Sequence, residues 1–186
     1  MALKIKWNAP VVLTYALICT SVYVADKFLM GALMPFFTVY PSMNWSNPLS
    51  LLSLVTHSMG HASLEHLLGN LTFILLLGPI IEEKYGSSKL IYMMLITSLV
   101  TGLINVFFFD TGLMGASGIV FMMILLVSFT NVSAGEIPIT FILVAILFVG
   151  KEFLQSVEVN QVAESAHIIG GICGSIFGFS GARREK

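Results

Sequence analysis

The sequence predicts an all-α membrane protein, a bundle of six transmembrane helices with a long membrane-associated loop between helices 1 and 2. Of the 186 residues, 56% are hydrophobic and 10% are charged, whereas soluble domains carry about 25% charged residues. The mean hydropathy of +0.92 agrees with this class. The apolar residues are also gathered into six separate stretches. A chain of this length has room for one bundle, so we expect a single domain over residues 1–186.

Six apolar stretches can span a membrane, at residues 10–25, 64–81, 90–109, 117–130, 137–150 and 163–179. Several are shorter than the about 20 residues that cross a full bilayer, and the stretch from Ser117 is the shortest clear case. If its inner end lies at the membrane surface, its outer end lies below the opposite surface. We therefore expect Ser117 to lie within the thickness of the membrane. Lys4 and Lys6 before the first stretch are also compatible with a signal peptide, but its place in a multi-span chain favours a transmembrane helix.

The charges predict an orientation and exclude one class of partner. With the N-terminus in the cytoplasm, two basic residues fall outside, Lys27 and Lys151, and seven fall inside: Lys4, Lys6, Lys84, Lys89, Arg183, Arg184 and Lys186. The positive-inside rule then favours cytoplasmic N- and C-termini, and we expect the cell membrane as the location. A formal net charge of −1 and the lack of a basic run argue against a nucleic-acid partner.

The connection over residues 26–62 is rich in apolar and aromatic side chains, which a solvated loop would not carry. We expect it to lie in the interfacial layer of the membrane, with Tyr40 and Trp45 at the depth of the headgroups. Its prolines exclude a long helix: Pro35, Pro41 and Pro48.

The stretch Gly115-Ala116-Ser117-Gly118 stands at the head of the fourth apolar segment. A serine between small residues at a helix start can be exposed to an incoming carbonyl group. The free N–H groups and the positive end of the helix dipole would stabilise the oxyanion that forms when a hydroxyl attacks a peptide bond. The alternative is a serine that only caps the helix.

His66 and Asn70 are four residues apart near the outer end of the second stretch, so they share one helix face. Both can donate hydrogen bonds without carrying charge. Two such donors directed into a bundle could hold an oxyanion. The alternative is that they bond to neighbouring helices.

His167 lies near the outer end of the sixth stretch, one turn before Gly170, and Gly170, Gly174 and Gly178 recur every four residues. A stripe of small residues lets another helix backbone approach closely. If that helix is the one that begins with Ser117 and Gly118, the imidazole reaches the hydroxyl and can act as a general base and then a general acid. The alternative is a histidine that hydrogen-bonds a backbone carbonyl.

His57 and His61 are also four residues apart, which suits a metal site when both lie on one helix. No third ligand is obvious, because the carboxylates of Glu65 and Glu164 are not placed to complete the set. Structural hydrogen bonding of the long loop is the favoured interpretation, and we expect no metal and no cofactor.

Together these motifs resemble the rhomboid family of intramembrane serine proteases, and the resemblance covers nearly the whole chain in the family's basic six-span form. The matching motifs are a G-x-S-G at Gly115 to Gly118, an H-x-x-x-N at His66 and Asn70 with His61 before it, an A-H-x-x-G-x-x-x-G at Ala166, His167, Gly170 and Gly174, and a Glu-x-x-x-Gly at Glu82 and Gly86. The long loop after the first span also matches the family's membrane-dipping loop.

The resemblance implies a Ser–His dyad, with Ser117 as nucleophile and His167 as general base. His66, Asn70 and the backbone N–H of Ser117 would form the oxyanion hole. No Asp lies inside a predicted span, which agrees with a dyad that lacks a third acid. The substrates would be single-span or multi-span membrane proteins, cut near the outer ends of their transmembrane segments.

Two positions depart from the family's pattern. Many members carry a Trp-Arg pair in the long loop, where this chain has Leu52 and Ser53. Many bacterial members carry a tyrosine four residues after the serine, packed under the catalytic imidazole. Phe121 stands there in this chain and would keep the ring contact without the hydroxyl.

Two other functions remain as alternatives. A small transporter or channel also places polar groups inside a bundle, but no Asp, Glu, Lys or Arg lies deep in a predicted span. A non-catalytic rhomboid-like protein would bind membrane clients without cutting them, and the presence of both Ser117 and His167 argues against it. The sequence leaves the oligomeric state open.

Overall fold

The computed structural model describes residues 3–130, 136–155 and 161–182, with the backbone alone at 148–155, 161–164 and 182. These residues form seven α-helices and two short 3₁₀ helices, in the order α1 (Pro10–Phe28), η1 (Met34–Phe37), α2 (Pro48–Thr56), η2 (His57–Met59), α3 (Leu64–Tyr85), α4 (Ser87–Phe108), α5 (Ser117–Val127), α6 (Ile139–Gln155) and α7 (Gln161–Ala182). Within these ranges the one extended pairing is a single antiparallel bridge between Val39 and Leu113. The predicted helical bundle is confirmed. Arg183, Arg184 and Lys186, which enter the orientation argument, lie outside the described residues.

In the described part of the chain, three helices are long and apolar enough to cross a membrane, namely α1, α3 and α4. The fourth predicted span, α5, is shorter: its 11 residues extend over about 17 Å, against about 30 Å for the hydrocarbon core. Helices α6 and α7 occupy the positions of the other two predicted spans. The count of six spans therefore stays a prediction.

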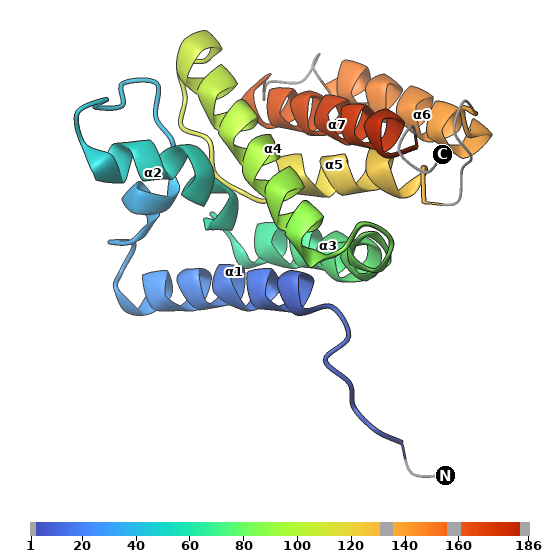
Figure 1. Ribbon diagram of the computed structural model, residues 1–186. Helices are drawn as coiled ribbons and strands as arrows, with labels where there is room; N and C mark the ends of the chain where they lie inside the picture. The colour runs from blue at the N-terminus through green and yellow to red at the C-terminus, as the bar shows by residue number, and fades with distance from the viewer. Residues whose placement is uncertain (1–2, 131–135, 156–160, 183–186) are drawn as a thin grey trace.

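Helix α5 lies at the centre of the bundle, between α3 and α7, and α4 crosses beside it (Figure 1). Most of its side chains are buried, including Ile119, Val120, Met122 and Met123. A helix that is apolar on every side is typical of a buried core helix or of a membrane span, and here the neighbouring helices cover α5. The first residue of α5, Ser117, is therefore held by a surrounded helix and not by a free loop.

The start of α1 is held by a carboxylate from the far end of α3. The buried Glu82 side chain accepts hydrogen bonds from the backbone N–H groups of Val11 and Val12, each at 3.1 Å, and from the Ser87 hydroxyl at 2.7 Å. A carboxylate satisfies the free N–H groups of a helix N-terminus and complements its dipole. Gly86, with φ +82°, ends α3 and reverses the chain. The Glu-x-x-x-Gly motif therefore joins α1, α3 and α4.

The end of α1 differs from the sequence prediction. The helix continues past residue 25 to Phe28, and the statement that no Asp lies in a span is wrong for Asp26. The Asp26 side chain is buried, and its Oδ1 accepts hydrogen bonds from the N–H groups of Leu33 and Met34 at 3.0 Å each. These bonds satisfy the carboxylate and hold the loop against the helix, so the last turn can form around a buried acid.

The long loop contains helix α2, which the sequence analysis missed. Pro48 occupies its first turn, and the Asn47 side chain caps it by accepting the N–H of Leu49 at 3.0 Å. Asn at the cap and Pro at the first position are a standard helix start. The helix packs on α4 through its buried Leu54. The prolines therefore exclude a long helix but start a short one.

Candidate active site

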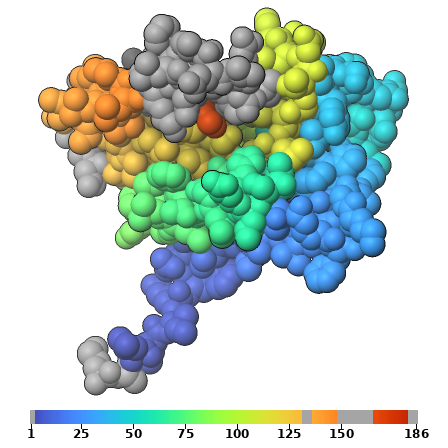
Figure 2. All heavy atoms as spheres, turned by 180° about the vertical axis from the view of Figure 1, so that it is seen from behind, coloured from blue at the N-terminus to red at the C-terminus, as the bar shows by residue number. Residues whose placement is uncertain are grey.

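The beginnings of α3, α5 and α7 meet around one cavity of about 1260 Å³. Five of the residues singled out from the sequence line it: His66, Asn70, Ser117, Phe121 and His167. Seen from behind, a small area of α7 (red) reaches the surface next to α3 (green) and α5 (yellow), as Figure 2 shows. Side chains from three helices that are distant in sequence therefore face a common space.

Ser117 is the first residue of α5 and is half-buried. The N-cap is Ala116, and α5 has no side-chain cap. The alternative that Ser117 only caps its helix therefore does not apply. The N–H groups of the first turn have no acceptor within the helix, so they are available beside the hydroxyl.

Gly115 shapes the approach to Ser117. Its φ is +123°, a conformation that L side chains rarely adopt. A Cβ at this position would lie 2.6 Å and 2.7 Å from Cε1 and Nε2 of His66, so the imidazole packs directly on the glycine. The N–H of Gly115 also donates to the backbone carbonyl of His57 at 2.9 Å. This glycine thus connects the long loop, the serine and His66.

His167 lies on α7 with its imidazole against the Phe121 ring, at 4.2 Å between ring centroids and 37° between planes. Below it the backbones of α5 and α7 are in direct contact. A Cβ on Gly170 would overlap the carbonyl group of Gly118, and a Cβ on Gly174 would overlap that of Met122. The small residues therefore let α7 carry His167 next to the start of α5.

Asn70 is buried, and its Nδ2 donor has no hydrogen-bond partner among the described residues. Buried polar groups are rarely left unpaired, so such a donor in a cavity suits an acceptor that arrives with a ligand. The alternative that Asn70 bonds to a neighbouring helix finds no support there. One turn earlier, His66 packs edge-on against His61, with 5.1 Å between ring centroids and 64° between planes.

His57 and His61 do not share a helix, because α2 ends at Thr56 and the chain is extended after η2. Each imidazole hydrogen-bonds a backbone carbonyl: Nε2 of His57 to Ser98 at 3.0 Å, and Nδ1 of His61 to Met59 at 3.2 Å. No group of three metal-ligand side chains occurs among the described residues. The structural interpretation of this pair is therefore favoured over a metal site.

Burial lowers the pKa of His57 from 6.5 to about 4. Burial, together with the nearby His66, lowers the pKa of His61 from 6.5 to about 4 as well. Both side chains therefore stay neutral in the folded protein at neutral pH and resist protonation until the solution is strongly acidic.

We expect the free energy of unfolding to decrease as the pH falls from about 6.5 to about 4. In this window the unfolded chain binds protons at both histidines and the folded chain does not, and the cost can reach roughly 3 kcal/mol for each fully buried histidine. The His57→Gln variant keeps an N–H donor for the Ser98 carbonyl but does not titrate. Unfolding measured at a series of pH values should show a smaller decrease for this variant, and equal curves for the two proteins would contradict the assignment.

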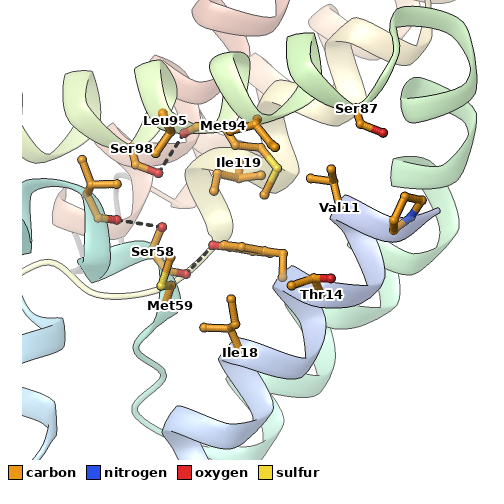
Figure 3. A pocket seen from close by; sticks show the side chains of 14 residues that line it. Val11, Thr14, Ile18, Ser58, Met59, Ser87, Met94, Leu95, Ser98 and Ile119 are labelled. Atoms are coloured by element: carbon orange, nitrogen blue, oxygen red, sulfur yellow. Dashed lines mark hydrogen bonds between the residues drawn. The ribbon is translucent and has the colours of Figure 1, made fainter.

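A second cavity of about 490 Å³ lies between α1, α4 and η2, and its walls are apolar (Figure 3). Tyr15 and Ser58 both line this cavity, and the Tyr15 hydroxyl donates a hydrogen bond to the Ser58 carbonyl at 2.7 Å. The hydroxyls of Ser58 and Ser98 donate to the carbonyls of Val55 and Met94. These hydroxyls are engaged within the protein, and none of the described residues that line the cavity is a histidine, so it does not resemble a catalytic site.

Sequence reasoning named His57 and Gly115 but missed two contacts through which they shape the site. The backbone carbonyl of His57 positions Gly115, and Gly115 provides the surface for His66. The one signal in the sequence is the glycine two residues before the serine, since glycine readily adopts the positive φ that Gly115 has. The contact with His57 joins residues 58 positions apart through the backbone, and no side-chain pattern reports such a bond.

The fold and the site define a helical membrane protein with a serine, two histidines and an asparagine around one cavity. The rhomboid domain model matches residues 48–184, and the chain belongs to the rhomboid family. The chain is 24% identical over 172 residues to the rhomboid protease GlpG of Haemophilus influenzae, covering 91% of this chain and 89% of that protein.

Further relatives are the proteins of the same name from Yersinia. The chain is 24% identical to the rhomboid protease GlpG of Yersinia enterocolitica and 25% identical to that of Yersinia pestis, in each case over 95% of this chain. It spans 64% of the length of these two proteins, which is less than two thirds.

Proposed function

We propose that this protein is an intramembrane serine endopeptidase that cleaves transmembrane segments of other membrane proteins near their outer ends. The observation that carries the proposal is the shared cavity at the beginnings of α3, α5 and α7, lined by Ser117, His167, His66 and Asn70. Membership of the rhomboid family and the names of its protease relatives support the same activity.

In the proposed reaction, the Ser117 oxygen attacks the scissile carbonyl carbon while His167 accepts the hydroxyl proton. The oxyanion accepts hydrogen bonds from the His66 side chain, the Asn70 amide and the N–H of Ser117. His167 then gives its proton to the leaving amine. A water molecule, activated by His167, hydrolyses the acyl-enzyme and frees the serine.

The short helix α5 supports a site inside the membrane. If its C-terminal end lies at the inner surface, its 11 residues leave Ser117 below the outer surface. Water then reaches the serine only through a polar cavity that is open to that side. The hydrocarbon core holds no water, so such a cavity must be enclosed by the protein. A helical substrate must unwind to present its carbonyl, so small or helix-breaking residues near the cut favour cleavage.

The orientation belongs to the same proposal. The excess of Lys and Arg at the predicted inner ends favours cytoplasmic termini, with the cavity open to the outside of the cell membrane. The partners are then membrane proteins and the bilayer itself.

A transporter would use buried charged side chains, and the part of the chain that the structure describes has two buried carboxylates, Asp26 and Glu82. Asp26 and Glu82 each bind backbone N–H groups at helix ends, so neither offers a relay for charge. A non-catalytic client-binding protein needs no serine at the head of α5. It also needs no Asn70 Nδ2 without a hydrogen-bond partner among the described residues, and both side chains line the cavity.

The test uses the purified protein in detergent with a model single-span substrate that has small residues near its outer end. Cleavage together with labelling by a serine-directed fluorophosphonate supports the proposal. Labelling without cleavage means that the site is formed and the model substrate is unsuitable. A folded sample with neither signal favours the client-binding protein, and then the transporter.

We expect Asn70→Ala to lower kcat by about 10²-fold, the typical value of one oxyanion donor. His66 and the N–H of Ser117 remain in this variant, so activity should persist. KM should change little, because the hydrogen bond strengthens in the transition state. A rise in KM with unchanged kcat would instead place Asn70 in ground-state binding.

A further inference from the structure

Among the described residues that line the cavity, one carries a carboxylate, Glu65, and this group has no role in the proposed reaction. No Asp, Lys or Arg is among the described residues that line the same cavity. The walls around the cavity include apolar side chains from three other positions, Phe73, Val144 and Leu147. A single charge beside low-dielectric walls acts on a ligand more strongly than the same charge in open water.

Glu65 is exposed and lies in the first turn of α3, directly before His66. The helix start is already capped, because the Ser63 side chain accepts the N–H of His66 at 3.1 Å. No hydrogen bond or ion pair to Glu65 occurs in the part of the chain that the structure describes. The lysine in the last turn of α1, Lys27, lies over the Tyr23 ring, with 5.0 Å from Nζ to its centroid. The Glu65 carboxylate is thus available to a ligand.

We propose that Glu65 determines substrate specificity by favouring a Lys or Arg side chain close to the scissile bond. The inference rests on the proposed function, in which the scissile carbonyl lies between Ser117 and His66. Glu65 is adjacent to His66, and an extended substrate advances about 3.3–3.6 Å per residue. The carboxylate therefore meets substrate side chains within roughly two or three residues of the cut. It repels Asp and Glu at the same places.

A simpler role for Glu65 is to complement the dipole of α3, as acidic residues in a first helical turn do. That role affects stability and is indifferent to the charge of a substrate. The ratio of kcat/KM between substrates that differ only in charge separates the two roles, because a general loss of activity cancels in it.

The experiment measures kcat/KM for a model single-span substrate with Lys, Gln or Glu placed in turn at each position flanking the cut. With the wild type, we expect the Lys form to exceed the Glu form by about fivefold or more at one or two positions, the rate equivalent of a partly exposed ion pair. Glu65→Gln should bring this ratio close to one, and Glu65→Lys should invert it. High salt should reduce the wild-type ratio by screening.

Glu83→Gln is the matched control, since it removes the same charge from an exposed position near the other end of α3. It should keep the wild-type ratio. The proposal is overturned if the wild type shows no charge preference, or if Glu65→Gln retains it.

A binding measurement separates this proposal from the proposed function. The same substrates are tested for binding to the Ser117→Ala variant, which cannot cleave. If the folded wild type shows neither cleavage nor fluorophosphonate labelling, but binds the Lys form more tightly, the protease is rejected and the charge selection by Glu65 is retained. Cleavage without any charge preference in either measurement would reject the role of Glu65 and retain the protease.

Discussion

Ser117→Ala should abolish cleavage of every substrate, with a loss of at least about 10⁴-fold in kcat. The change removes the oxygen atom that forms the acyl-enzyme. The oxyanion donors remain, but without the Ser117 oxygen no tetrahedral intermediate forms for them to stabilise. The fold should persist, because Ser117 does not cap α5 and alanine is a better helix former than serine. Fluorophosphonate labelling should disappear with the cleavage.

If Ser117 and His167 act as a dyad, their single and double variants should lose similar activity. His167→Ala should lose activity to a similar extent, and the double variant should be no worse than either single one, because residues that act as a unit are not additive. Additive losses would mean that the two side chains act separately.

Ser175→Ala is the matched serine control. Ser175 also lies on a helix of the bundle, but its hydroxyl donates to the Gly171 carbonyl at 2.8 Å and it is not among the residues that line the cavity. This variant should retain both cleavage and labelling. Full activity in Ser117→Ala would reject the mechanism.

Gly170→Val should separate α5 from α7 and lower both stability and activity. Even the first carbon of a side chain at Gly170 would overlap the backbone carbonyl of Gly118, and a backbone cannot rotate out of the way as a side chain can. Inserting atoms into packed interiors costs about 1–3 kcal/mol where neighbours can adjust, so we expect at least about 3 kcal/mol here. The shift of α7 also moves His167 away from Ser117, so activity should fall more than stability alone explains.

Gly69→Val provides the control for this substitution. Gly69 is a helical glycine in α3 with open space at the position of its Cβ. Its replacement should leave the thermal unfolding temperature nearly unchanged. Equal unfolding temperatures for Gly170→Val and the wild type, with equal activity, would contradict the close contact of α5 and α7.

Much of the helical architecture follows from local patterns in the chain. The starts at Pro10, Leu64 and Ser117 were predicted at the residues where the structure places them, because proline, capping residues and apolar runs act through neighbouring atoms. The helix ends were less accurate. The extra turn that contains Asp26 depends on hydrogen bonds to the loop that follows. Helix α2 was missed, although Asn47 and Pro48 are typical residues for the start of a helix.

The residues of the site could be selected from motif spacing, but their arrangement could not be derived from it. A four-residue spacing places His66 and Asn70 on one face of a helix; it does not say that this face meets Ser117. The two sides come together because Gly170 contacts Gly118 directly and because the His66 imidazole packs on Gly115. The hydrogen bond from the Gly115 N–H to the His57 carbonyl holds this arrangement. Local sequence therefore sets which groups are present and how each helix begins, whereas the close approach of separate backbones brings the groups together, because contacts between distant segments form only when the whole bundle is packed.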